Sequence, residues 1–191
     1  MSKLTQRIAA VLLFLLATGV VHNAAAADFP SQLKTGEHSL VLNGWGARTK
    51  YLLELYVAGL YLSEASSDPV AIAGADLPMS IRIKITSRFV SQEKLVDSLT
   101  DGFRNSTNGN LAGIQSQINQ FRKCFHEAIS QGDTFDIVYL PKSGVIVNKN
   151  GKFKGVIAGI EFKKALFNIW LSDNPADETL KQAMLVQKSR R

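Results

Sequence analysis

Arg48 is the residue whose type and setting in this sequence most clearly suggest chemistry. It stands near the start of a long apolar, aromatic and β-favouring run from Leu42 to Leu62. An arginine keeps its charge at physiological pH, so beside apolar surface it needs an anionic partner. Two interpretations follow: a solvent-facing arginine at a strand end, or an anion anchor at the mouth of an apolar pocket.

The run that carries Arg48 has the pattern of a β-strand. Odd positions from 47 to 57 are nearly all apolar, which predicts a strand with one buried face. From Tyr56 to Leu62 even positions become apolar too, which favours the covered centre of a sheet. Gly44 and Gly46 allow unusual backbone angles or a close backbone approach.

Other chemistry-bearing residues are sparse. Cys124 is the only cysteine, which excludes an intramolecular disulfide and a cysteine-based metal cluster. It falls in an apolar helical pattern, so we expect a buried thiol rather than a reactive one. The histidines at 22, 38 and 126 have no metal-binding spacing, and no nucleotide-binding glycine motif or Gly-x-Ser-x-Gly elbow is present. We therefore expect no metal and no cofactor.

Residues 1–27 have the three-part pattern of a cleavable signal peptide. Lys3 and Arg7 form a basic start, Ile8–Val21 is apolar, and small alanines precede Asp28. The apolar run is shorter than the roughly 20 residues that a membrane span needs. We expect a periplasmic or secreted protein with one mature domain over residues 28–191.

The formal net charge is +6 and is spread along the chain. Export argues against nucleic acid as a partner, whereas weak attraction to an anionic membrane surface stays open. The oligomeric state is not predicted.

The coarse element pattern predicts an α+β domain. Residues 28–36 form a polar lead-in, and antiparallel strands are segregated from helices in the remainder. Expected strands cover His38–Asn43, the run described above, Pro78–Thr86, Phe135–Leu140, Val145–Val147 and Phe153–Ile157, with an Asn-Gly hairpin turn within Asn148–Gly151. Expected helices begin at Asp68-Pro69, at Ser91 and after Gly159, and cover Leu111–Ile129 and Pro175–Val186.

Several of these segments together resemble the chalcone isomerase-like family, in its bacterial exported branch, over roughly residues 36–185. The matching segments are Asn43-Gly44-Trp45-Gly46-Ala47-Arg48, Tyr56-Val57-Ala58-Gly59-Leu60-Tyr61-Leu62, Ser91–Leu95, Asp133–Pro141, Asn150–Gly155 and Ala165–Asp173. The Gly-x-Arg…Gly-Leu-Tyr-Leu pair with Ile-Trp-Leu-Ser-Asp is fairly specific.

The resemblance implies a curved antiparallel β-sheet with helices layered on it, an open-faced sandwich with a ligand cleft between the layers. In plant enzymes of the family, an arginine at the position of Arg48 polarises the reacting oxygens during chalcone cyclisation. In the fatty-acid-binding members the same arginine holds the carboxylate, helped by a tyrosine that corresponds to Tyr56. Guanidinium and phenol can share one carboxylate through charge-assisted hydrogen bonds.

The sequence departs from the family's enzymes in three places. Ser91 stands where they carry a catalytic tyrosine, their helix asparagine falls near Ser98, and a later serine or threonine falls near Asn168. In addition, one straight strand would separate Arg48 from Tyr56 by about 26 Å, at roughly 3.3 Å per residue. The two can share a ligand only if the backbone reverses between them.

We hypothesise a non-catalytic binder of an amphipathic carboxylate such as a fatty acid, with Arg48, Tyr56, Ser91, Ser98 and Asn168 as candidate ligand-binding residues. The alternative is an isomerase, an intramolecular lyase acting on a chalcone-like phenolic, with Arg48 as its catalytic group. A third class, an accessory protein that works by protein contact, predicts a cleft closed by side chains.

Overall fold

The computed structural model describes residues 29–185, so the predicted signal peptide lies outside the described residues. Seven antiparallel strands pair in sequence order in one sheet, β1 to β7. They are β1 Gln32–Thr35, β2 His38–Lys50, β3 Leu53–Leu62, β4 Met79–Ile85, β5 Thr134–Leu140, β6 Gly144–Lys149 and β7 Lys152–Ile157. The helices are α2 Pro69–Gly74, α3 Gln92–Ser106, the 3₁₀ turn η1 Ala112–Ile114, α4 Gln115–Lys123, α5 Ile160–Leu171 and α6 Glu178–Leu185.

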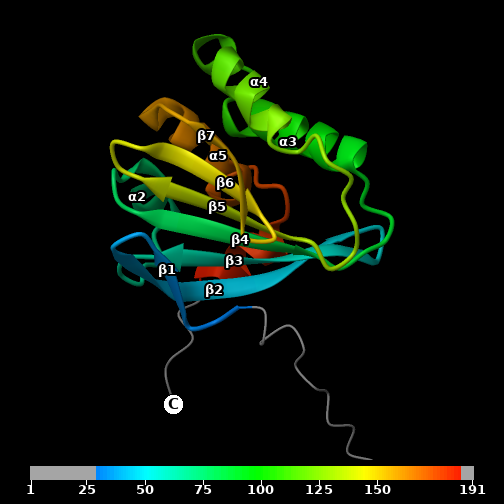
Figure 1. The fold of residues 1–191 in the computed structure, drawn as a ribbon, viewed down its shortest axis with the longest axis horizontal. Coiled ribbons are helices and arrows are strands. Elements are labelled where there is room, and N and C mark those ends of the chain that lie inside the picture. The colour runs from blue at the N-terminus through cyan, green and yellow to red at the C-terminus, as the bar shows by residue number, and fades with distance from the viewer. Residues whose placement is uncertain (1–28, 186–191) are drawn as a thin grey trace, which may run out of the picture.

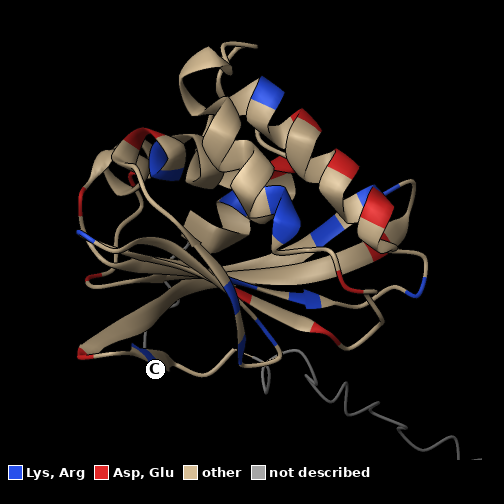
Figure 2. Cartoon of the chain, turned by 45° about the horizontal axis from the view of Figure 1, so that its top comes forward, with Lys and Arg blue, Asp and Glu red and all other residues tan. Residues whose placement is uncertain are grey.

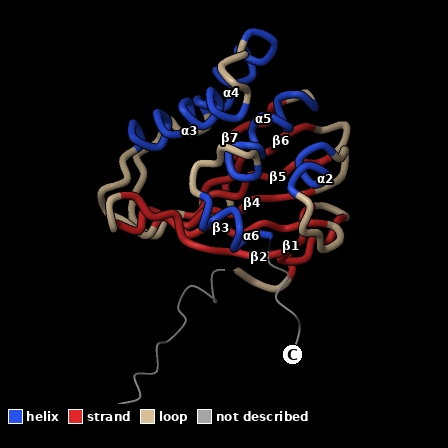
Figure 3. Tube along the Cα trace, turned by 180° about the vertical axis from the view of Figure 1, so that it is seen from behind, coloured by secondary structure: helices blue, strands red, loops and turns tan. Residues whose placement is uncertain are grey.

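The helices are layered on the curled sheet (Figure 1). Helices α3 and α5 pack together, α4 lies against β7, and charged residues mark the outward face of α3 (Figure 2). Seen from behind, α6 lies against β2 and β3, whereas α2 lies beside α5 (Figure 3). The predicted α+β class, a curved antiparallel sheet with helices layered on it, is confirmed. Within residues 29–185, no helix has the length and apolar character needed to cross a membrane.

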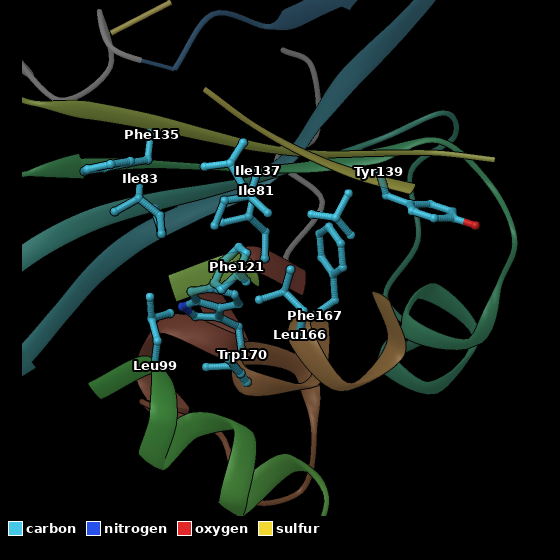
Figure 4. Packing of buried hydrophobic residues seen from close by; sticks show 14 of the residues in the cluster. Ile81, Ile83, Leu99, Phe121, Phe135, Ile137, Tyr139, Leu166, Phe167 and Trp170 are labelled. Carbon is cyan, nitrogen blue, oxygen red and sulfur yellow. The ribbon is translucent and has the colours of Figure 1, made fainter. Parts of the chain in front are cut away.

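The space between the sheet and the helices is filled by aromatic and branched side chains (Figure 4). Phe103 of α3, Phe121 of α4 and Phe162 of α5 pack with ring centroids 5.6–6.0 Å apart. Alternate residues of β4 face them, as the period-2 pattern predicted. A smaller cluster on the opposite face of the sheet joins Val57 and Tyr61 of β3 to residues near the start of the described chain. Strand β3 is therefore buried on both faces from Tyr56 to Leu62, as predicted.

Three local predictions are confirmed by their hydrogen bonds or backbone angles. Asp68 caps α2 by accepting from two backbone N–H groups at 2.9 and 3.0 Å. Ser91 caps α3 by accepting from the N–H of Lys94 at 3.3 Å. The β6–β7 hairpin turns at Asn150 and Gly151, which adopt φ values of 51° and 74°. These capping and turn residues act on their own neighbours, which is why the sequence alone could locate them.

Three boundaries differ from the sequence-based prediction. The expected lead-in contains β1, a short edge strand whose mostly polar residues gave no alternating pattern. The helix expected over Leu111–Ile129 is the short turn η1 followed by α4, which ends at Lys123. Cys124 and Phe125 lie beyond α4 but are buried, so their apolar character reflects tertiary packing rather than helix. The last helix begins at Glu178, three residues later than expected.

The stretch from Leu42 to Leu62 is a β-hairpin rather than one strand, and this difference decides the site. The chain reverses at Tyr51 and Leu52, whose φ values are 51° and 63°. The predicted apolar face therefore breaks at the turn, where these two side chains are 91% and 101% exposed. Tyrosine and leucine are not turn-forming residues, so the sequence carried no sign of the reversal.

Close packing of α6 on β2 fixes the position of the strand that carries Arg48. A Cβ at Gly44 would overlap the backbone of Ala183 in α6, so only glycine allows this approach. The buried amide of Asn43 donates to the carbonyls of Ser66 and Met184, both at 2.8 Å. The Gly-Trp-Gly segment thus serves a close backbone approach, one of the two roles the sequence allowed.

Candidate functional site

Arg48 and Tyr56 lie directly opposite each other on β2 and β3. They are paired in the strand register, and the guanidinium carbon of Arg48 lies 5.7 Å from the centroid of the Tyr56 ring. The hairpin turn supplies the backbone reversal that the two residues need if they are to share a ligand. Their side chains face the helix layer, toward α3 and α5.

Arg48 is half-buried and its charge is not neutralised within the described chain. Its Nη1 donates to Oγ of Ser98 on α3 at 2.7 Å. Among residues 29–185 it forms no ion pair with an aspartate or glutamate. The carboxylate of Asp177 instead accepts from the backbone N–H groups of Thr49 and Leu180, at 3.1 and 2.9 Å. An arginine has five N–H donors, so most of the donors of Arg48 remain for another acceptor.

Tyr56 is a buried, neutral phenol beside this cation. Its oxygen accepts a hydrogen bond from Nε1 of Trp170 on α5 at 3.0 Å. Burial raises the pKa of the phenol, and the nearby charge of Arg48 opposes that shift only in part. The phenol therefore keeps its proton. Because its oxygen already accepts the indole N–H, its own O–H can be donated to a ligand.

A small cavity of about 70 Å³ lies beside this pair. Its wall combines cationic and hydroxyl groups with apolar side chains, from Arg48, Leu55, Tyr56, Phe89, Val90, Lys94, Leu95 and Ser98. Drug-sized ligand pockets are typically about 300–1,000 Å³, so this cavity is too small to enclose a whole fatty acid. The space further inside is occupied by the core (Figure 4).

Comparison with known proteins shows the family of this chain. The sequence matches the chalcone isomerase-like family over residues 21–186. The chain belongs to the chalcone isomerase-like family. A similar solved structure is a fatty-acid binding protein of Arabidopsis thaliana, with a TM-score of 0.65 and 17% sequence identity. The match covers 82% of this chain and 90% of that one. At this identity the likeness concerns the fold. No curated protein matched the sequence significantly.

The fold brings together three of the five candidate residues of this chalcone isomerase-like chain. Arg48, Tyr56 and Ser98 line one cavity. Ser91 does not line it, because its hydroxyl caps the first turn of α3. Asn168 lies in a separate groove of about 480 Å³, formed by the end of α3, η1 and the outward side of α5.

The sequence interpretation missed several cavity residues. Trp170 was placed among apolar helix positions, although a buried indole N–H usually has an acceptor, which is a signal that could have been used. Lys94 lies in the first turn of the helix expected to begin at Ser91, and no sequence pattern assigned it a role at the site. In the structure its Nζ donates to the carbonyl of Phe89 at 3.2 Å and adds a second cation to the wall. Phe89 itself lies in the loop between β4 and α3, which no motif marks.

The described part of the chain contains no residues arranged for metal binding and no exposed thiol. Over residues 29–185, no group of three or more histidine, cysteine, aspartate or glutamate side chains could hold a metal ion. Cys124 is 4% exposed, and burial raises the pKa of its thiol. The expectation of a buried cysteine is confirmed.

Proposed function

We propose that this protein is a non-catalytic binder of an amphipathic carboxylate such as a fatty acid, with the carboxylate held at Arg48. One observation carries the proposal. A half-buried guanidinium that has no ion pair within residues 29–185 stands in the wall of a cavity that is otherwise largely apolar. A charge in such a setting needs an anion, and the apolar wall selects one with an aliphatic or aromatic body.

The polar groups around the cavity suit a carboxylate. The guanidinium of Arg48 supplies charge-assisted donors, and the protonated phenol of Tyr56 supplies a neutral one. Ser98 holds Arg48 in place from α3. Lys94 adds positive charge at the wall formed by the loop between β4 and α3. The carboxylate would therefore be oriented from two strands and one helix.

The tail of the ligand requires the cavity to widen. The loop carrying Phe89 forms one wall, and its ring is already 53% exposed. This loop is held by hydrogen bonds of 3.2–3.3 Å from the N–H groups of Phe89 and Val90 to Ser87. Movement of this loop would give the tail access to apolar surface. Burying about eight methylenes would contribute roughly 6 kcal/mol at about 0.8 kcal/mol each, so the tail supplies most of the affinity and Arg48 the orientation.

The family and the N-terminal sequence pattern support the same proposal. The similar Arabidopsis thaliana structure is that of a fatty-acid binding protein, and it shares the fold. The N-terminal pattern of residues 1–27 supports export of the mature domain, so we place the protein in the periplasm or outside the cell, as in the exported bacterial branch of the family.

The test is a titration of dodecanoic acid into the mature protein, residues 28–191, and into Arg48→Ala. We expect Arg48→Ala to bind at least about tenfold more weakly, because a charge-assisted pair contributes about 1.5–3 kcal/mol. Arg104→Ala is the matched control: Arg104 is an exposed arginine paired with Asp101 on α3, and its removal should not change the affinity. Equal affinities of the wild type and Arg48→Ala, or no binding by either, would contradict the proposal.

Family membership keeps the intramolecular lyase as a second candidate. Its discriminating assay is the loss of chalcone absorbance with purified protein. Turnover that is stereoselective and lost in Arg48→Ala would replace the binder with a lyase. Against this alternative, the hydroxyl of Ser91, which stands where the family's enzymes carry a catalytic tyrosine, points into the helix cap. If native mass spectrometry finds no ligand on the purified protein and neither assay responds, an accessory role by protein contact is favoured.

A further inference from the structure

The tip of the β2–β3 hairpin is built from residues that a tight turn disfavours. Tyr51 and Leu52 both adopt positive φ, a region where bulky side chains are strained and glycine or asparagine is normal. Both side chains are almost fully exposed. The β6–β7 hairpin makes its turn with Asn150 and Gly151 instead. Neither turn geometry nor packing accounts for two large apolar side chains at the β2–β3 tip.

A second exposed aromatic side chain lies beside this tip. The backbone N–H groups of Thr86 and Ser87 both donate to the carbonyl of Leu55 at 3.2 Å, so the loop after β4 runs along the base of the hairpin. Figures 1 and 3 show the hairpin and this loop side by side at the same end of the sheet. Phe89 projects from the loop and is about half exposed.

Each of these aromatic rings has a cationic side chain next to it. Nζ of Lys50 lies 5.5 Å from the centroid of the Tyr51 ring, and the guanidinium carbon of Arg88 lies 5.0 Å from that of Phe89. Residues 50–53 and 88–89, which carry these rings, include two basic side chains, Lys50 and Arg88, and no acidic one.

We propose that Lys50–Leu53 and Arg88–Phe89, here called the docking tip, bind the surface of an anionic lipid bilayer. Aromatic and leucine side chains flanked by lysine and arginine suit the membrane interface, where the apolar groups enter the acyl boundary and the cations meet anionic headgroups. The position of the docking tip in the fold supports this partner. Phe89 also lines the cavity beside Arg48, so docking would bring the cavity mouth to the layer into which amphipathic carboxylates partition.

A second copy of the chain fits this surface less well. The docking tip is narrow, whereas a stable protein interface buries about 800 Å² on each partner. Two identical tips would also bring their cations together. A bilayer needs neither a large area nor shape complementarity, because its binding depends on the depth of insertion and on headgroup charge.

The test is flotation of the mature protein, without fatty acid, with vesicles of phosphatidylcholine alone or mixed with phosphatidylglycerol. The key variant is the double substitution Tyr51→Asn, Leu52→Gly, which installs the turn chemistry of the other hairpin. It should keep or improve stability, so a loss of binding cannot be attributed to misfolding. We expect the wild type to bind the anionic vesicles, more weakly as salt rises, and the variant to need about tenfold more lipid or worse.

The matched control is the double substitution Val70→Ser, Leu77→Ser. These side chains are 79% and 59% exposed and belong to the connection between β3 and β4, at the opposite end of the sheet. This variant should bind vesicles like the wild type. Absence of vesicle binding, equal binding by the Tyr51→Asn, Leu52→Gly variant, or an equal loss in the control would overturn the proposal. Self-association of the wild type that this variant abolishes would also overturn it, in favour of a second copy.

This result does not depend on carboxylate binding. The assay contains no fatty acid, and Arg48→Ala should still float with anionic vesicles even though its affinity for dodecanoic acid falls. The two proposals can therefore fail separately.

Discussion

Two cationic side chains lie on the helix-covered side of the sheet, at opposite ends of the sheet. They differ in how many of their N–H donors have acceptors. Lys163 of α5 is fully buried, and its Nζ donates to the carbonyls of Ile72, Ala73 and Ala75, at 3.2, 2.8 and 2.7 Å, where α2 ends. Arg48 is half-buried, donates to the hydroxyl of Ser98 and lies against Tyr56 beside a cavity.

In this comparison, spare hydrogen-bond donors, rather than burial, distinguish the cation that we propose as the ligand anchor. An ammonium group has three donors, and Lys163 uses all three on backbone carbonyls. Burial lowers its pKa to about 8, a strong perturbation for a group that has a structural role. Arg48 has more donors than partners and a cavity in front of them. A search by pKa shift alone would have selected Lys163 instead of Arg48.

The largest expected effect on stability comes from removing Lys163, whose three N–H donors all have acceptors. Lys163→Met leaves three carbonyls at the end of α2 without their donor, so we expect a loss of about 3 kcal/mol in unfolding free energy. Urea denaturation of both proteins measures it. Lys164→Met is the control, because Lys164 forms only a surface pair with Glu161. A loss below about 1 kcal/mol for Lys163→Met would mean that the α2 carbonyls find water instead.

Tyr56→Phe should have the next largest effect on stability. It leaves the indole N–H of Trp170 buried without its acceptor, which costs about 1–3 kcal/mol. Urea denaturation followed by tryptophan fluorescence reports both the stability and the indole environment. Tyr51→Phe, at an exposed tyrosine, should leave both unchanged. If the two variants behave alike, the Tyr56–Trp170 bond is not a significant link between β3 and α5.

The pH dependence of stability sharpens the comparison, because the lowered pKa of Lys163 falls in a pH range where the folded protein can be studied. Its pKa falls from 10.5 to about 8 on folding, so between these values the unfolded chain binds more protons and stability rises with pH. The stability difference between the wild type and Lys163→Met should widen above pH 8, by at most about 1.4 kcal/mol per pH unit. A constant or shrinking difference would show that the carbonyls hold Lys163 protonated.

The smallest expected change in stability is that of Arg48→Gln. Because it removes a half-buried charge that has no ion pair within residues 29–185, we expect a change within about 1 kcal/mol in either direction. Urea denaturation should therefore give a stability close to that of the wild type while dodecanoic acid binding is weakened. A loss as large as that of Lys163→Met would make Arg48 a structural cation as well.

Features that act between chain neighbours were predictable from the sequence. The caps of α2 and α3, the alternation of β4 and the Asn-Gly turn all depend on residues a few positions apart. The special role of Gly44 was also visible, because glycine in an apolar strand indicates a close backbone approach. The α+β class followed from the order of these elements.

The site itself was only half predictable. Arg48 stood out as a cation in an apolar run, but its meeting with Tyr56 depends on a reversal at Tyr51 and Leu52 that no turn chemistry announces. Ser98 meets Arg48 because α3 lies over the hairpin, whereas Ser91, seven positions earlier, is used in the cap. Lys163 was passed over inside an apolar helix.

The sequence by itself determined the elements, the permanent charge at Arg48 and the apolar character of its surroundings, because these are properties of residue types and short-range spacing. The tertiary structure alone decided that all N–H donors of Lys163 have acceptors, whereas Arg48 keeps donors for a further acceptor. That outcome depends on long-range packing: α5 carries Lys163 against the end of α2, while α3 gives Arg48 one hydroxyl and leaves a cavity beside it. Partners so distant in the chain leave no local pattern.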